Sequence, residues 1–167
     1  MIVQTTWRFD QPPEVIWPLL CNSRMEPTGS CLFGLGVPQP EQCRLPDGQG
    51  GVGSTRQCIS NKGTIEQRIL VWDAPQRLSF RMEKTDLYFK PCVPNIVENF
   101  VLEEMLAGGT RATRTTDVQV TGWFRWPKQV MLWMGLKKVH HFVFRNWARL
   151  ARESECELVT VAKSPAN

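Results

Sequence analysis

Hydrophobic and polar residues alternate at the start of the chain. In IVQTTWRFD, residues 2–10, one side of an extended backbone carries Val3, Thr5, Trp7 and Phe9, and the other side carries Gln4, Thr6, Arg8 and Asp10. This pattern predicts a half-buried strand. Pro12 and Pro13 end it, and residues 13–22 then have a helical period, since the first turn of a helix tolerates proline. A short helix is predicted there, with inward-facing Val15, Ile16 and Leu19.

Alternation returns in the middle of the chain. It predicts strands over residues 52–59, 64–73 and 77–84, and two longer strands within residues 96–124. Short turns join these strands, and the last turn contains Gly108-Gly109, which suits the positive φ angles of a tight hairpin. Such connections indicate antiparallel neighbours. Residues 24–51 are rich in glycine and proline and have no period, so a long loop or short helical turns are predicted for them.

From Pro127 to about Arg152 the pattern has a helical period. One side of this helix carries the apolar residues Leu132, Leu136, Val139, Val143, Trp147 and Leu150, widened by Trp133 and Phe144, with His140 near its centre. The opposite side carries the basic residues Lys128, Lys137, Lys138, Arg145, Arg149 and Arg152, interrupted by Met131, Met134 and Phe142. No acidic residue occurs between 127 and 152.

This order of elements, together with FDQPPEVIW, GVGSTRQC, WDAPQRLSF and GGTRATRTT, resembles the polyketide cyclase/dehydrase-like branch of the START/Bet v 1 superfamily, also called SRPBCC. The resemblance covers nearly the whole chain, and its motifs mark turns and packing positions. It implies an α+β helix-grip fold, in which a curved antiparallel sheet of about six or seven strands wraps around a long C-terminal helix. Short helices after the first strand would then cover an apolar cavity. The insertion at 29–51 departs from the pattern at the expected entrance.

Length and composition fit one domain over residues 1–167. The net charge of +4 is too small to indicate a nucleic-acid partner. The N-terminus lacks the order of a secretory signal, and no apolar run is long enough to span a bilayer, so a cytoplasmic protein is expected. The six cysteines lack metal-ligand spacing and are expected to be free thiols, mostly buried; they are Cys21, Cys31, Cys43, Cys58, Cys92 and Cys156. No metal or cofactor is expected.

One segment of the chain matches a known glycine-rich motif. GQGGVG, residues 48–53, fits GxGxxG, but a dinucleotide site needs this motif after a strand and before a helix. Here it follows a proline-rich loop and precedes a strand. Nucleotide binding is therefore not favoured.

Few polar groups are candidates for chemistry inside the cavity. His140 is either a ligand partner or acid/base, or a neutral core histidine bonded to a backbone carbonyl. Arg114 shares a strand face with Ala112, Thr116 and Val118. If that face is concave, Arg114 needs an acidic partner or an anionic ligand, and Glu98 is the best partner by parity. An exposed Arg114 remains the alternative, and the same two alternatives hold for Arg56.

Aromatic residues are the other candidates for the cavity wall. Two to four of the seven tryptophans are expected to touch a ligand; the seven are Trp7, Trp17, Trp72, Trp123, Trp126, Trp133 and Trp147. The complete set of predicted ligand-binding residues is Trp7, Phe9, Arg56, Glu98, Phe100, Arg114, Trp133, Leu136, His140 and Phe144.

The function favoured by the sequence is binding or transport of a small hydrophobic molecule, lipid-like or aromatic. One alternative is an enzyme resembling the polyketide aromatase/cyclases, with His140 as acid/base and Arg114 stabilising an enolate. The second alternative resembles superfamily members that activate a heat-shock chaperone through their surface, where Lys137 and Lys138 would contact the partner. The basic side of the last helix is either solvated or docks on an acidic membrane surface or partner, and a monomer and a homodimer are both compatible with the sequence.

Overall fold

The computed structural model describes residues 1–27, 33, 37–46, 48, 50–123 and 125–162, the stretch 155–162 by its backbone alone. Among the described residues, helices α1 (Pro13–Cys21) and α3 (Arg125–Ala162) accompany eight strands. The strands are β1 (Ile2–Phe9), β2 (Ser23–Arg24), β3 (Pro40–Arg44), β4 (Thr55–Ser60), β5 (Gly63–Asp73), β6 (Arg77–Thr85), β7 (Asn95–Glu104) and β8 (Thr110–Gln119).

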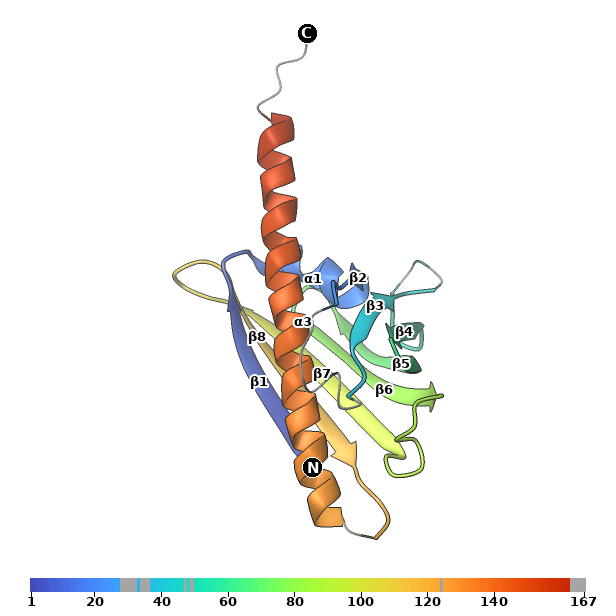
Figure 1. Cartoon of the computed structure of the whole chain (residues 1–167). Coiled ribbons are helices and arrows are strands. Elements are labelled where there is room, and N and C mark those ends of the chain that lie inside the picture. The colour runs from blue at the N-terminus through green and yellow to red at the C-terminus, as the bar shows by residue number, and fades with distance from the viewer. Residues whose placement is uncertain (28–32, 34–36, 47, 49, 124, 163–167) are drawn as a thin grey trace.

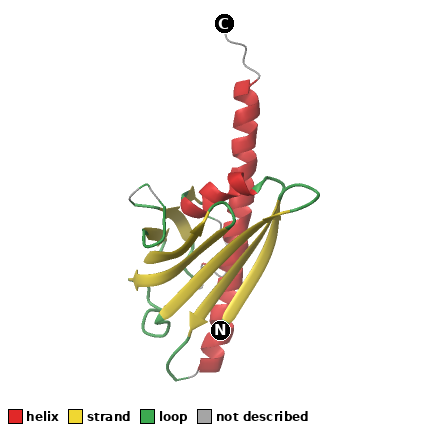
Figure 2. Cartoon of the chain, turned by 180° about the vertical axis from the view of Figure 1, so that it is seen from behind, coloured by secondary structure: helices red, strands yellow, loops and turns green. Residues whose placement is uncertain are grey.

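All eight strands form one antiparallel sheet in the order β1-β8-β7-β6-β5-β4-β3-β2. The sheet curves, and α3 runs along one of its faces (Figure 1). Figure 2 shows the opposite face, where the strands lie in front of α3. The α+β helix-grip arrangement expected from the sequence is therefore confirmed.

Strand alternation explains which side chains face α3. Along β1, Val3, Thr5 and Phe9 are buried and Trp7 is half-buried, while the residues between them are exposed. Pro12 and Pro13 precede the body of α1 as expected, and Ile16 and Leu20 of α1 are fully buried against the sheet. The break near the start of the chain thus turns the backbone from β1 into a helix that covers one end of the sheet.

The core has two parts. The α1 cluster, at the end of the sheet where α1 lies, is dominated by aromatic side chains, among them Phe80, Phe100, Phe144 and Trp147. The Met82 cluster consists of Met82, Val93, Ile96, Val118 and Val120, and Leu132 and Leu136 of α3 pack against it. Buried polar side chains lie on the strands between these two parts.

The predicted strand count was too low, because the structure has eight strands. The two additional strands, β2 and β3, lie in residues 24–51 or at their edge, where a loop was predicted. In the register of β3 and β4, Cys43 lies opposite Cys58. Neither strand has a readable period, since β2 has two residues and β3 begins at a proline after a glycine-rich stretch.

The last helix is longer than predicted, because α3 begins at Arg125 and continues to Ala162. Phe142 does not interrupt its basic side, since Phe142 is buried and its ring lies 5.2 Å from that of Phe33. Val37 also approaches α3, at Gly135. The segment predicted as a loop thus covers part of the helix, and this explains the burial of Phe142.

Candidate functional site

Seven of the buried polar residues lie on the sheet face that α3 covers or on α3 itself. We call them the polar belt: Thr5, Arg56, Gln67, Glu98, Arg114, Thr116 and His140. Six come from β1, β4, β5, β7 and β8, and His140 comes from α3. The six on strands share one face because each has the strand parity of its buried neighbours. Since buried polar groups are costly unless bonded, their partners decide what each residue can do.

Arg56 joins the end of α1 to the sheet. Its Nε and Nη2 atoms donate to the carbonyl of Leu20, at 3.0 and 2.9 Å, and Nη1 donates to Oε1 of Gln67. The guanidinium carbon lies 4.5 Å from the centre of the Phe80 ring. The carbonyl of Leu20 is at the C-terminal end of α1, where a positive charge is favourable. These contacts favour a structural role for Arg56.

Glu98 and Arg114 form a buried ion pair that is incompletely satisfied. Arg114 Nη2 lies 2.7 Å from both carboxylate oxygens and donates a hydrogen bond to Oε1. Glu98 Oε2 and Arg114 Nε have no hydrogen-bond partner among the described residues. The guanidinium also lies over the ring of Phe100, at 5.2 Å. The site therefore offers one unused acceptor and one unused donor in the protein interior.

His140 lies between two threonine hydroxyls. Nδ1 is 2.9 Å from Oγ1 of Thr5 and Nε2 is 2.9 Å from Oγ1 of Thr116, so one ring nitrogen donates and the other accepts. Burial, together with the smaller effect of the charges of Arg114 and Lys137, lowers the pKa of His140 to about 2. His140 is consequently neutral near pH 7, and its partners are side chains instead of the backbone carbonyl predicted for a core histidine.

The aromatic residues predicted as ligand contacts divide into buried and surface groups. Phe9, Phe100 and Phe144 are buried in the α1 cluster, and Trp147 lies among them with its indole N–H donating to Ser23. Leu136 packs against the Met82 cluster. Trp133 instead is 47 % exposed, so it lies apart from the polar belt.

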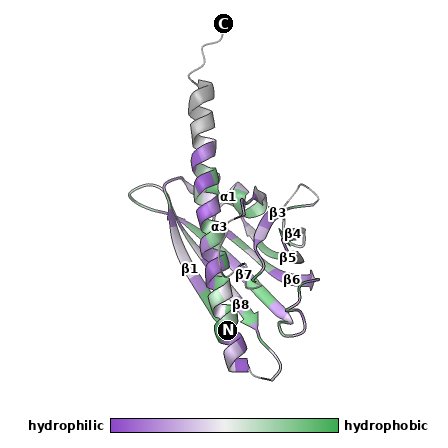
Figure 3. Ribbon diagram, in the orientation of Figure 1, coloured by the Kyte–Doolittle hydropathy of each residue, from purple (hydrophilic) through white to green (hydrophobic). Residues whose placement is uncertain are grey.

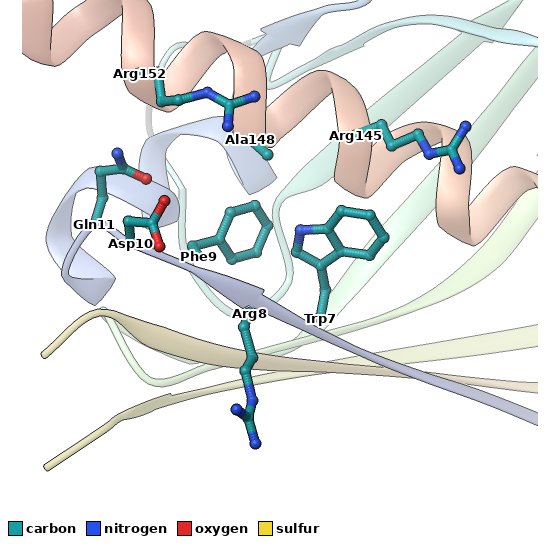
Figure 4. Close-up of a pocket in the computed structure, with 8 residues that line it drawn as sticks. All are labelled: Trp7, Arg8, Phe9, Asp10, Gln11, Arg145, Ala148 and Arg152. Atoms are coloured by element: carbon teal, nitrogen blue, oxygen red, sulfur yellow. The ribbon is translucent and has the colours of Figure 1, made fainter. Parts of the chain in front are cut away.

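Trp7 lines a hollow near the end of β1. This hollow has a volume of about 260 Å³ and lies between β1 and α3, with Phe9 and Ala148 also on its walls. Figure 4 shows the Trp7 indole under α3, with Arg145 and Arg152 above and Arg8 turned to the other side of the strand. Trp7 stacks on Phe144, with ring centres 6.0 Å apart. Trp7 thus forms an aromatic wall of this hollow, where the core meets the surface.

The polar belt includes residues that sequence reasoning left out of the predicted site. Thr5 and Thr116 share the strand parity of predicted residues, and that parity was the available signal. Gln67 is on a strand without a predicted site residue, and it lies opposite Arg56 in the register of β4 and β5. Cys43 and Cys58 border the belt. Their Sγ atoms are 3.7 Å apart, and the Cys58 thiol lowers the pKa of Cys43, helped by the nearby Arg56 and opposed by burial. Cys31 and the side chain of Cys156 lie outside the described residues.

The GQGGVG segment has a packing role. A side-chain carbon at Gly50 would overlap the indole of Trp72, which in turn packs edge-on against Trp17 at 5.2 Å. The segment leads into β4, a strand, instead of a helix. This geometry lacks the helix N-terminus that a phosphate site of this type requires.

Comparison with known proteins places the fold. No protein-family model matches the chain, and no curated protein matches its sequence. Solved structures do match its shape. A START superfamily protein from Mycobacterium smegmatis has a TM-score of 0.63 at 11 % identity, with 91 % of this chain and 97 % of that chain covered. The Zhui aromatase/cyclase from a Streptomyces species has a TM-score of 0.63 at 15 % identity, covering 91 % and 93 %. Ara h 8.0201 has a TM-score of 0.63 at 12 % identity, covering 92 % and 98 %.

The chain has the START/Bet v 1-like helix-grip fold. In the START/Bet v 1-like fold observed here, the polar belt lies between the sheet and the helix that the sheet grips. At sequence identities of 11 % to 15 %, the similar structures support the shared fold but do not assign a function to any residue of this chain. The chemistry of this site therefore has to be argued from the chain's own contacts.

Proposed function

We propose that the chain binds a small, largely apolar molecule between the sheet and α3, with Glu98 and Arg114 as its polar contacts. The observation that carries this proposal is that two buried polar atoms of one ion pair, Glu98 Oε2 and Arg114 Nε, have no hydrogen-bond partner among the described residues. Two apolar clusters flank the pair and supply the hydrophobic surroundings typical of small-molecule sites. The fold supports the same conclusion, because a similar structure is named as a START superfamily protein.

The two atoms specify the polar group of the ligand. A hydroxyl donates one hydrogen bond and accepts another, so it satisfies the carboxylate oxygen and the guanidinium N–H together. An apolar molecule of the same size leaves both unsatisfied. A phenol or an alcohol attached to a ring or chain is therefore the favoured ligand class.

An enzymatic function of the aromatase/cyclase type is less favoured. One similar structure carries that name, but it requires a group that exchanges protons near neutral pH. The pKa of His140, lowered to about 2, is far from the range for efficient acid/base catalysis, and both ring nitrogens are already bonded. Arg114 is already neutralised by Glu98. The contacts of the polar belt therefore favour binding over catalysis.

The proposal is tested with two aromatic molecules that differ by one hydroxyl. Binding of naphthalene and 2-naphthol is measured by quenching of tryptophan fluorescence, and we expect the wild type to bind 2-naphthol about tenfold more tightly. The variant Glu98→Leu/Arg114→Met removes both charges together and is expected to abolish this preference. The matched control is Glu103→Leu/Arg111→Met, which removes an exposed ion pair on the same two strands. If neither molecule binds saturably, or if the hydroxyl preference survives the buried double substitution, the proposal is wrong.

Native mass spectrometry of the purified protein provides the complementary measurement. A retained small molecule that carries a hydroxyl supports the proposed class. Its loss from the Glu98→Leu/Arg114→Met variant, with retention in the control, would link it to the ion pair.

A further inference from the structure

Large hydrophobic side chains are exposed together where α3 begins. We call this group the Trp/Met face: Trp123, Trp126, Val130, Met131, Trp133 and Met134, which are 84 %, 76 %, 42 %, 74 %, 47 % and 47 % exposed. The remaining large hydrophobics that are exposed among the described residues are scattered over the rest of the chain, at Ile2, Val52, Leu70, Tyr88 and Leu106. Single exposed hydrophobics are ordinary, but a contiguous group indicates an interaction surface.

Helix geometry makes this group one surface. Trp126, Val130 and Trp133 are spaced by four and three residues and lie on one side of α3, next to Met134. Leu132 and Leu136 point the other way and pack against the Met82 cluster. The first turns of α3 reach past the start of β1 (Figure 1), and hydrophobic and hydrophilic residues alternate on the visible side of these turns (Figure 3). This end of the helix is therefore apolar on two sides, of which the sheet covers one.

The charge around the Trp/Met face is positive. Between Asp117 and Glu153 the sequence contains seven basic residues and no acidic one; the basic residues are Arg125, Lys128, Lys137, Lys138, Arg145, Arg149 and Arg152. Asp117 itself lies beside the N-terminal ammonium group, at 3.5 Å. The Lys137 ammonium lies 5.9 Å from the ring of Trp133 and donates to the backbone oxygen of Gln4. A basic group thus lies beside one indole of the face.

A polar hollow adjoins this surface. It has a volume of about 360 Å³, and Arg125, Gln129, Met1 and residues 118–122 line it. Two of its lining residues, Gly122 and Arg125, lie one residue before and two residues after Trp123 in the sequence, so the hollow is near the start of the face. A guanidinium in a polar hollow next to exposed indoles suits an anionic phosphate group.

We propose that the Trp/Met face docks peripherally on an anionic lipid bilayer. The indoles would lie at the depth of the headgroups, where tryptophan is enriched in membrane proteins, and Lys138 and Arg125 would contact lipid phosphates. None of the described helices is both long and apolar enough to cross a membrane, so the contact is peripheral. This inference is independent of the ligand proposed above.

Charge complementarity distinguishes a lipid surface from a second copy of the chain. A symmetric dimer through this face would bring two sets of basic residues together, which costs free energy by repulsion. An anionic bilayer instead attracts the lysines and accommodates the indoles and methionines. Only the anionic lipid surface complements both the positive charge and the exposed apolar side chains of the face.

The test is co-sedimentation with vesicles of phosphatidylcholine, with and without phosphatidylglycerol. We expect the wild type to bind the anionic vesicles and to be released as salt is raised, because screening weakens the lysine contacts. Binding is accompanied by a blue shift of tryptophan fluorescence. Trp126→Ser/Met131→Ser and, separately, Lys138→Glu are each expected to weaken binding about tenfold or more.

Matched controls remove exposed residues elsewhere. Leu106→Ser changes a fully exposed leucine between β7 and β8, and Lys62→Glu reverses a charge in the turn between β4 and β5. Both are expected to bind vesicles like the wild type. Absence of wild-type binding to the anionic vesicles, or equal binding by the Trp126 and Leu106 variants, would overturn the proposal. So would a concentration-dependent dimer, seen by analytical ultracentrifugation, that only the Trp126→Ser/Met131→Ser variant disrupts.

Discussion

The Arg114 guanidinium lies 2.7 Å from both carboxylate oxygens of Glu98 on the neighbouring strand, and both side chains are buried. Strand parity alone made Glu98 the expected partner of Arg114. The register explains why: Glu98 pairs with Thr116 and Phe100 pairs with Arg114, so the two charged residues are diagonal neighbours on one face. Each charge depends on the other because both are removed from water.

Removing one member of this pair is expected to destabilise the fold more than removing both. Glu98→Leu leaves a buried guanidinium without its counter-charge, which lowers the free energy of unfolding by about 3–5 kcal/mol. Glu98→Leu/Arg114→Met removes the uncompensated charge and is expected to recover part of that loss. Urea unfolding followed by circular dichroism measures both. The exposed counterpart Glu103→Leu is expected to cost less than about 1 kcal/mol. Equal losses for the single and double variants would contradict this account.

His140 is expected to make the fold sensitive to mild acid. Its pKa is about 2 in the folded protein and near 6.5 in the unfolded chain, so only the unfolded chain binds this proton between these values. Stability therefore falls as the pH drops below about 6.5, by about 1.4 kcal/mol per pH unit, or about 2 kcal/mol by about pH 5. Urea unfolding at pH 7 and pH 5 measures the change.

The neighbouring histidine supplies the control for this prediction. His141 is exposed, although partial burial and Lys137 lower its pKa somewhat. His140→Gln is expected to lose most of the pH dependence between pH 7 and pH 5, whereas His141→Gln is expected to retain it. Identical pH dependence in the wild type and His140→Gln would show that His140 binds its proton equally in both states.

Alternation and turn chemistry were sufficient for most of the fold. They predicted β1 and β4 to β8, and they predicted the hairpin at Gly108 and Gly109, whose φ angles of 85° and 81° require glycine. They could not predict β2 and β3, whose pairing comes from contacts with β4 that residues 24–51 do not encode locally. Hydrophobic alternation predicts strands least well where a short strand depends on pairing with its neighbours.

The same patterns predicted where individual candidate residues lie, and their role in binding a ligand stays a prediction. The parity of β7 and β8 brought Glu98 and Arg114 together, but the helical arc also assigned Trp133 to the interior, and it is half exposed. The angular position of a residue around a helix predicts which side of the helix it is on. It does not predict whether the sheet extends far enough to cover that residue. The hydroxyl partners of His140 are 135 and 24 residues away in sequence, and no local signal specifies them.

Gly50 is expected to tolerate no side chain, because Trp72 occupies the space that its Cβ would need. Gly50→Ala forces either the indole or the backbone to move, which costs about 1–3 kcal/mol of stability. Gly51→Ala is the matched control, since the nearest atom to its Cβ would be Oγ of Ser54 at 3.8 Å. Thermal unfolding of the two variants measures the difference. If both variants unfold at the same temperature as the wild type, stability does not require the close packing of Gly50 on Trp72.

Cys43 is expected to ionise at a lower pH than an ordinary thiol. The hydrogen bond between the Cys43 and Cys58 sulfur atoms, 3.7 Å apart, is the largest cause of the lowered pKa, and Arg56 adds a smaller favourable contribution against the cost of burial. Cys58→Ala removes this hydrogen-bond partner but leaves the burial, so the pKa of Cys43 should rise. Titration of thiolate absorbance in the ultraviolet follows this change. Cys92→Ala removes a thiol outside the pair and should keep the low-pH component, whereas loss of that component in both variants would exclude the Cys43–Cys58 contact as its cause.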